Sequence, residues 1–179
     1  KWRRAVREHG NAVLRDTDAD GKADLVKYFG DYPIYGSYGT GMRIHNGYLY
    51  YSSQMQVYRQ KLTQGKMIPD GKPELIVQDT HEKSRREHIG KPIAFDGKGN
   101  IFVAFGAPSN ACQNPKRTPG ASGEDPCSQL DTYGGIWKFK EDVLNQTQAQ
   151  GEKYATGIRS LVCMEWNEEV NSLYTVMHG

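Results

Sequence analysis

The chain has 179 residues, which fits one domain or part of a larger one, and 20 glycines with 11% aromatic residues favour an all-β, turn-rich fold. Its 23 Lys and Arg residues are mixed among 21 Asp and Glu residues, giving a net charge of +2, so nucleic acid is not expected as a partner. No apolar run approaches the roughly 18 to 20 residues of a membrane-spanning helix, so no membrane span is expected.

The first feature along the chain is an acidic loop, "DTDADGKAD", followed by a strand-like segment, "DLVKYFG". The loop places carboxylates at Asp16, Asp18, Asp20 and Asp24 around Gly21. Alternating Asp residues direct several oxygens to one point and glycine permits a sharp turn, which is how proteins hold a hard cation such as Ca²⁺. We predict a structural calcium site that is not an EF-hand, because a strand follows in place of a helix. The alternative is a solvated turn built from good turn formers.

Three segments then repeat one pattern, in which a short apolar strand, a tight turn and a second apolar strand follow one another. They are residues 41–53, 91–106 and 160–179. Equivalent apolar positions are 51 and 69 residues apart, and periods of about 50 favour propeller blades. Alternating outer strands are expected at residues 55–62 and 135–142. The sequence therefore predicts a β-propeller.

The third repeat stops at His178 and Gly179, directly after its second strand. About three blades do not close a ring without exposed edges. We therefore expect residues 1–179 to be part of a single propeller domain of about three blades. We expect this domain to be incomplete at the C-terminus and, by the same reasoning, at the N-terminus.

The three cysteines fall into two settings. Cys112 and Cys127 flank the loop "CQNPKRTPGASGEDPC", whereas Cys163 lies in the apolar run "LVCMEW". Loops of this length are usually floppy unless cross-linked, which favours a disulfide, and free thiols in a reducing compartment are the alternative. Cys163 is predicted to be a buried thiol. No second cysteine pair or nearby histidine completes a zinc site.

Charged residues precede the inner strands of two adjacent repeats, where the loops of a propeller line one mouth of the channel. Glu87 and His88 precede one strand and Arg159 precedes the next. An imidazole titrates near neutral pH and a carboxylate can orient it, so His88 is suited to act as a general base. A guanidinium can clamp a carboxylate or polarise a carbonyl. The alternatives are a solvated loop histidine and a salt bridge at a blade edge.

The segments "HIGKPIAFDGKGNIFVAFGAPSNAC", "RTPGASGEDPCSQLDTYGGIWKF" and "GEKYATGIRSLVCMEWN" resemble the glucose and sorbosone dehydrogenases that use pyrroloquinoline quinone (PQQ). "LRDTDADGKADLV" and "GTGMRIHNGYLYYSS" fit the sorbosone dehydrogenase-like branch. The resemblance implies a six-bladed propeller, periplasmic or secreted, with the quinone and Ca²⁺ over the channel mouth. It also implies a sugar as substrate and an electron acceptor such as a cytochrome or quinone.

The same resemblance implies roles for particular residues. His88 would take the proton of the substrate hydroxyl while hydride passes to the quinone, and Glu87 would orient His88 or contact the cofactor. Arg159 would lie beside the quinone carbonyl. Ser160, where soluble glucose dehydrogenases carry Asn, would be a further cofactor contact. Gly179 falls where backbone carbonyls help to hold the cofactor's calcium.

The expected activity is thus oxidation of an aldose or sorbosone-like sugar by bound quinone. The alternative from another class is a propeller that serves as a binding or scaffold module, for glycans for example, with a decayed quinone site. A lactonase-like hydrolase fits less well, because such enzymes place several acidic ligands at the channel and only Glu87 lies near it.

Overall fold

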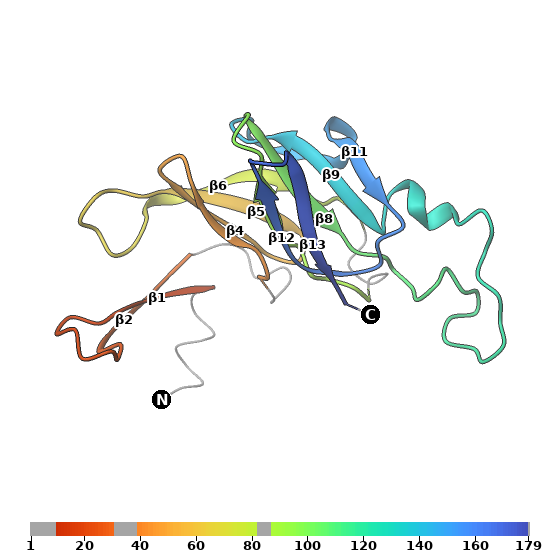
Figure 1. Cartoon of the computed structure of the whole chain (residues 1–179), viewed down its shortest axis with the longest axis horizontal. Helices are drawn as coiled ribbons and strands as arrows, with labels where there is room; N and C mark the ends of the chain where they lie inside the picture. The colour runs from red at the N-terminus through yellow and green to blue at the C-terminus, as the bar shows by residue number, and fades with distance from the viewer. Residues whose placement is uncertain (1–9, 31–38, 82–86, 179) are drawn as a thin grey trace.

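The computed structural model of the chain describes residues 10–30, 39–81 and 87–178. Within these ranges the chain forms β-strands joined by turns and two short 3₁₀ segments, with no α-helix (Figure 1). The all-β prediction is therefore confirmed. Among the residues that the structure describes, no helix has the length and apolar character needed to cross a membrane.

The first large sheet is an antiparallel meander of four strands. These are β3 (Met42–His45), β4 (Tyr48–Ser52), β5 (Gln56–Lys61) and β6 (Asp70–Gln78). Asn46 and Gly47, with φ of 45° and 78°, make the two-residue turn between β3 and β4 that the sequence predicts. The short strand β10 (Gln146–Thr147) pairs in parallel with β6 and extends the outer edge.

The second large sheet repeats the same meander. Its strands are β7 (Ile93–Phe95), β8 (Asn100–Phe105), β9 (Gly135–Lys140) and β11 (Glu152–Thr156). Two hairpins complete the described chain, β12 (Leu161–Asn167) with β13 (Ser172–Met177), and β1 (Asn11–Arg15) with β2 (Leu25–Phe29). The three repeated hairpins and both predicted outer strands are thereby confirmed.

Two strands lack a sequence signal of their own. Pro73 lies inside β6, and proline normally argues against a strand interior. It is tolerated because the register with β5 is irregular between the Arg59 pair and the Lys61 pair, the stretch that contains it. The outermost strand β11 has four exposed residues out of five and no strong apolar alternation.

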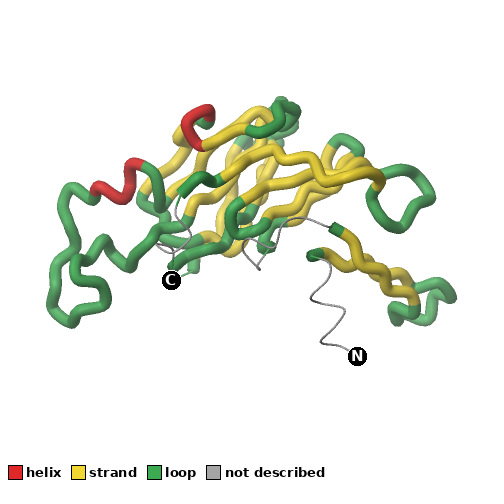
Figure 2. Tube along the Cα trace, turned by 180° about the vertical axis from the view of Figure 1, so that it is seen from behind, coloured by secondary structure: helices red, strands yellow, loops and turns green. Residues whose placement is uncertain are grey.

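The strands of the two large sheets lie beside one another in layers (Figure 2). β8 alternates its buried side chains between two neighbours. Ile101, Val103 and Phe105 pack with residues of the first sheet such as Ile76. Phe102 and Ala104 on the other face pack against Leu161 and Met164 of β12. A sheet buried on both faces between two similar sheets is the arrangement of blades in a propeller.

The prediction that Cys163 is buried is wrong, since this thiol is exposed. Leu161 and Met164 turn toward the second sheet, and the pairing of β12 with β13 is irregular between Leu161 and Cys163. The irregularity places Cys163 on the opposite face of the hairpin, where Val162 and Tyr174 are also exposed. An apolar run therefore signalled a strand correctly but not which of its faces is covered.

Candidate active site

The imidazole of His88 is held by one backbone carbonyl. His88 lies in the loop that leads into β7, and its Nδ1 is 2.7 Å from the carbonyl oxygen of Ala107, just beyond the end of β8. A carbonyl oxygen only accepts hydrogen bonds, so Nδ1 must carry the proton. In the neutral ring Nε2 is then the unprotonated nitrogen, which is the form that a general base requires.

Ala107 also anchors the chain beside Arg159. The Ala107 N–H donates to the carbonyl oxygen of Arg159 over 2.8 Å. One residue at the end of β8 therefore holds the imidazole of His88 on its carbonyl side and the backbone of Arg159 on its amide side. The structure brings together the two charged positions that the sequence repeats predicted to be neighbours.

Two glycines permit this close approach. A Cβ atom on Gly106 would overlap the carbonyl oxygen of His88, and one on Gly90 would lie 2.9 Å from the carbonyl oxygen of Leu161. The loops leading into β7 and β12 thus run against their neighbours at backbone distance, which only glycine allows.

The guanidinium of Arg159 is fixed from two directions. Its Nη1 donates to Oδ1 of Asn110 at 3.1 Å, and its Nη2 donates to the carbonyl oxygen of His178 at 2.8 Å. The backbone N–H of His178 donates in turn to the carbonyl oxygen of Ser160 at 3.0 Å. A half-buried arginine held in this way presents a positive charge with a defined position.

Glu87 points to a different partner from the one suggested by its place next to His88. Its carboxylate accepts a hydrogen bond from Nη2 of Arg117 at 3.0 Å, and Nζ of Lys116 lies 3.9 Å away. The hydrogen bond from Arg117 holds the pKa of Glu87 below its usual value. The contact that orients the imidazole comes from Ala107, and Glu87 ties the His88 loop to the cysteine loop.

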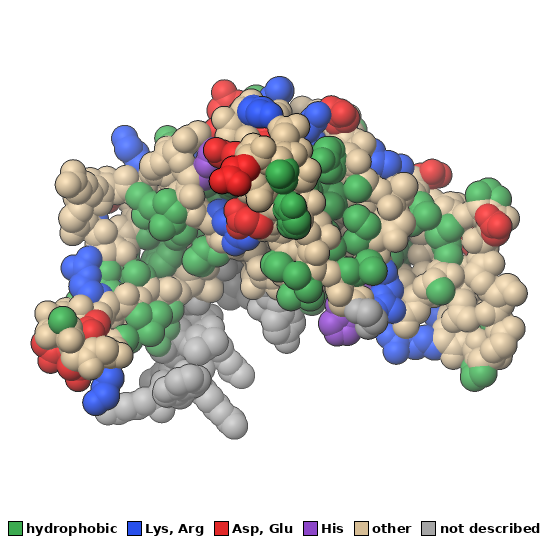
Figure 3. Space-filling view, in the orientation of Figure 1, with side chains coloured by type: hydrophobic (Ala, Val, Ile, Leu, Met, Phe, Trp, Pro, Cys, Tyr) green, Lys and Arg blue, Asp and Glu red, His purple; other side chains and the backbone are tan. Residues whose placement is uncertain are grey.

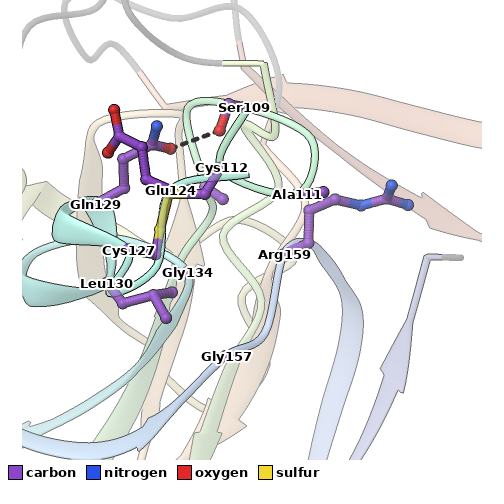
Figure 4. A pocket seen from close by; sticks show the side chains of 11 residues that line it. Ser109, Ala111, Cys112, Glu124, Cys127, Gln129, Leu130, Gly134, Gly157 and Arg159 are labelled. Atoms are coloured by element: carbon purple, nitrogen blue, oxygen red, sulfur yellow. Dashed lines mark hydrogen bonds between the residues drawn. A yellow bond between two sulfur atoms is a disulfide. The ribbon is translucent and has the colours of Figure 1, made fainter. Parts of the chain in front are cut away.

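The disulfide between Cys112 and Cys127 is present, so that prediction is confirmed. It closes a loop that borders a pocket of about 270 Å³ next to Arg159. Figure 4 shows Gln129 and Ser109 hydrogen bonded to each other in this pocket, with the guanidinium of Arg159 directed away from the disulfide. Glu124 and Leu130 also line it, so that polar and apolar groups both face the space.

Positive charge gathers on this side of the molecule. Lys116 and Arg117 lie in the disulfide-closed loop and Arg159 before β12. In the view of Figure 3, Lys and Arg side chains lie beside a histidine along the lower edge. We call the surface formed by His88, Lys116, Arg117 and Arg159 the mouth, and its cations favour an anionic ligand.

The acidic loop between β1 and β2 is a separate, exposed feature. Carboxylate oxygens of Asp16, Asp18 and Asp20 lie within 4.8 Å of one another, as a cation site requires. Asp24 is not in this group, and its carboxylate accepts hydrogen bonds from the backbone N–H and the hydroxyl of Thr17. The structure thus brings three of the four predicted ligands together, while the fourth closes the loop.

Asp16 also organises the turn itself. Its two oxygens accept the backbone N–H groups of Ala19 at 2.7 Å and Gly21 at 2.8 Å. These bonds, with that from Gly21 the stronger influence, hold the pKa of Asp16 below its usual value. The carboxylate therefore stays ionised to a lower pH than an unperturbed aspartate.

Sequence reasoning did not single out Ala107, Asn110 or Arg117, although they hold the three site residues. Asn110 and Arg117 could have been selected from the sequence, since polar residues in a long loop next to a strand end often belong to binding sites. The contribution of Ala107 is made entirely by its backbone and leaves no trace in the residue type. Gly179 lies outside the described residues.

The stacked four-stranded meanders and the basic mouth that holds His88 define a β-propeller with a candidate active site. Residues 33–179 match the family model described as glucose / sorbosone dehydrogenase. The chain belongs to the glucose/sorbosone dehydrogenase family. No curated protein matches the sequence significantly.

Solved structures support the fold. The chain is similar to the holo form of the pyranose dehydrogenase PQQ domain from Coprinopsis cinerea, with a TM-score of 0.64 and 13% identity over 95% of this chain. It is similar to a calcium structure of a Trichoderma reesei carbohydrate-active enzyme of family AA12, with a TM-score of 0.64 and 12% identity over 93% of this chain. It spans 39% and 40% of the lengths of those two chains.

Proposed function

We propose that the protein containing this chain is a quinone-dependent dehydrogenase that oxidises an aldose or a sorbosone-like sugar. The observation that carries the proposal is the hydrogen bond from Nδ1 of His88 to the carbonyl of Ala107. It leaves Nε2 as the basic nitrogen of the neutral ring at the mouth of the propeller, beside a fixed arginine. The family to which the chain belongs supports the same chemistry.

The residues present fit pyrroloquinoline quinone. This cofactor carries several carboxylates, and the mouth carries Lys116, Arg117 and Arg159, whose charges suit such an anion. Arg159 is our principal candidate for holding the cofactor, with Ser160 and Glu87 as further contacts. Because Glu87 is itself paired with Arg117, it would act by setting the position of that cation.

When bound, the quinone supplies the acceptor for a hydride from the sugar carbon. Nε2 of His88 accepts the proton of the substrate hydroxyl as the carbon–oxygen bond becomes a carbonyl, so that charge does not build up on the substrate oxygen. The bond to Ala107 keeps Nδ1 protonated and holds the ring in place both before and after Nε2 takes the proton. Arg159, held by Asn110 and the carbonyl of His178, would supply the positive charge that stabilises the negative charge gained by the quinone oxygen.

Two calcium sites belong to the proposal. A carbonyl at Gly179 would contribute to the ion that accompanies the cofactor. The acidic loop would hold a second, structural ion through Asp16, Asp18 and Asp20, with Asp24 completing the loop. The convergence of three carboxylates around a glycine turn supports the second site.

We further propose that the whole protein is a six-bladed propeller that acts in the periplasm or outside the cell. The disulfide supports such a location, because disulfides persist in oxidising compartments. The similarity to longer propeller-domain structures supports the presence of further blades. An external cytochrome or quinone would accept the electrons.

The test is reconstitution of the full-length protein with PQQ and calcium, followed by dye reduction with a panel of aldoses and sorbosone. We expect sugar-dependent reduction that requires both additions. The matched control is His45→Gln, which alters another half-buried histidine, one that bonds to Glu141 at the far end of the first hairpin. It should leave turnover per folded molecule unchanged.

A folded full-length protein that binds no quinone would contradict the proposal that the protein is a quinone-dependent enzyme. Glycan binding by such a protein, measured by calorimetry with oligosaccharides, would then favour a binding module with a decayed site. Quinone binding without turnover of any sugar would overturn the substrate class alone.

A further inference from the structure

The loop that carries His88 starts from a buried carboxylate that the proposed mechanism does not use. Asp79 directly follows β6, and its side chain is 1% exposed. Its backbone N–H donates to the carbonyl oxygen of Met55 over 2.7 Å, which fixes it to the end of the first sheet. A buried carboxylate is costly unless it is paired, so its partners show what the fold gains from it.

The carboxylate of Asp79 binds groups from both ends of the segment 79–91. Oδ1 accepts the backbone N–H of His81 at 3.1 Å and Nδ1–H of the same residue at 2.8 Å. Oδ2 accepts Nζ of Lys91 at 3.0 Å, and the Lys91 side chain is only 2% exposed. One carboxylate therefore binds both His81 and Lys91, which lie on either side of Glu87 and His88 in the sequence.

Lys91 also contacts the end of β8, the same strand end to which His88 is bonded. Its ammonium donates to the carbonyl oxygen of Ala104 at 3.2 Å and lies 4.0 Å from the centre of the Phe105 ring. The imidazole of His88, three residues before Lys91, bonds to Ala107, three residues after Ala104. Residues 88–91 are thus tied to residues 104–107 at both ends.

Lys91 also ties residues 88–91 to the first sheet. Its backbone N–H donates to the Thr40 hydroxyl at 2.6 Å, and its carbonyl oxygen accepts the Ser52 hydroxyl at 2.7 Å. Both ends of the segment are therefore hydrogen bonded to the first sheet. Asp79 bonds to Met55 at one end, and Lys91 bonds to Ser52 at the other. Asp79 joins these two connections through a single charged group.

We propose that Asp79 is a positioning residue that sets where Nε2 of His88 lies relative to Arg159. Removing its charge weakens the hold on Lys91 and on His81 together, so residues 88–91 shift against residues 104–107. A small displacement of a catalytic base lowers the rate of chemistry much more than it lowers binding. This inference rests on the proposed function, because it assigns Asp79 a role in the same proton transfer.

The test uses the full-length protein loaded with PQQ and calcium. Asp79→Asn, which keeps the shape and removes the charge, should lower kcat by about 10- to 100-fold with KM and quinone affinity nearly unchanged. Asp79→Glu, which restores the charge, should recover a large part of the lost kcat. The control is Asp96→Asn, a buried aspartate that accepts bonds from Lys98 and Asn100 beyond the other end of β7.

Asp96→Asn should leave kcat per folded molecule unchanged. An unchanged kcat in Asp79→Asn, or an equal fall in both variants, would overturn the proposal. If Asp79→Asn does not fold, the double variant Asp79→Asn with Lys91→Met removes both buried charges. It should fold and remain slow, and recovery of wild-type kcat would count against a positioning role.

A second readout does not depend on turnover. Exchange of the C2 hydrogen of each histidine with deuterium, followed by mass spectrometry, reports the surroundings of His88 in the folded protein. Asp79→Asn should change the exchange rate of His88 and leave that of His45 unchanged. If the wild type neither binds quinone nor turns over, the proposed function fails, while an unchanged His88 rate would overturn the inference about Asp79.

Discussion

Two regions of this chain gather charged side chains, and they do so by different means. In the acidic loop, Asp16 and Asp24 accept hydrogen bonds from residues at most seven positions away. At the mouth, His88 is held by a residue 19 positions away and the guanidinium of Arg159 by Asn110, 49 positions away. The acidic loop is organised by its own sequence, whereas the mouth exists only when the sheets have stacked.

The difference also concerns burial. The acidic loop is exposed throughout, so solvent screens its charges and its contacts add little to global stability. The loop of His88 rests on Asp79 and Lys91, which are nearly inaccessible to water. The proposed chemistry, which depends on position, is thus supported by the core, whereas the proposed ion site lies in a surface turn.

The largest expected effect is at the mouth. His88→Ala should lower kcat of the full-length holoenzyme by about 10²- to 10⁴-fold, because the proposed proton acceptor is lost. Quinone binding, measured by absorbance titration, should persist, since Arg159 is untouched. Turnover equal to the wild type would remove His88 as the base.

Gly106→Ala should be the next most harmful change, although it alters no charged group. The added methyl group overlaps the carbonyl oxygen of His88, so the loop must shift, and a displacement of about 1 Å can cost about 100-fold in rate. Steady-state kinetics with thermal melting measures both effects. Gly90→Ala, whose Cβ would lie 2.9 Å from its neighbour, should show a smaller loss, and the reverse order would contradict this explanation.

Removing the disulfide by Cys112→Ser with Cys127→Ser should act on stability more than on chemistry. A cross-link closing a loop of about 15 residues contributes about 3 kcal/mol to the free energy of unfolding by the chain-entropy estimate. Turnover should fall only modestly, through weaker pairing of Arg117 with Glu87. The matched control is Cys163→Ser, an exposed thiol whose loss should not shift the denaturation midpoint.

The smallest effect on turnover is expected from the acidic loop. The pKa values of Asp16 and Asp24 are held below 3.8 by hydrogen bonds, chiefly from Gly21 and from the Thr17 hydroxyl. Their stabilisation is therefore complete above pH 3.8 and is lost as the pH falls through the lower, folded-state values. Hydrogen exchange, corrected for its intrinsic pH dependence, should show β1 and β2 opening on acidification before β8.

Asp16→Asn should remove the share of that pH dependence that Asp16 contributes and leave the share of Asp24, while kcat stays unchanged. Calcium added at neutral pH should slow exchange in the wild-type hairpin and not in the variant. Equal opening of β8 and the hairpin on acidification would show that the two regions are not independent.

The strand order of each sheet was largely predictable from local pattern. Asn46 and Gly47 specified a hairpin, and the unbroken apolar run from Ile101 to Phe105 on β8 is typical of a strand that is buried on both faces. β6 escaped prediction because Pro73 sits in an irregularity that only the pairing with β5 reveals. Cys163 was predicted on the wrong face because an apolar run does not report which neighbour covers it.

The candidate site was likewise predictable from the sequence only in part. The sequence placed His88 and Arg159 before equivalent strands, which predicted their proximity. It did not predict that Glu87 pairs with Arg117, because residue order favoured the adjacent histidine while the fold brings the disulfide-closed loop closer to the carboxylate.

By itself, the sequence determined most of the strands, the tight turns, the acidic loop and the residue types available for chemistry, since all of these follow from short-range sterics and side-chain pattern. Only the tertiary structure decided which nitrogen of His88 carries the proton and where its loop is clamped. The physical reason is that these features depend on the backbone carbonyl of Ala107 and on the buried pair of Asp79 and Lys91. A carbonyl is common to every residue, and it acquires a specific partner only when the sheets pack.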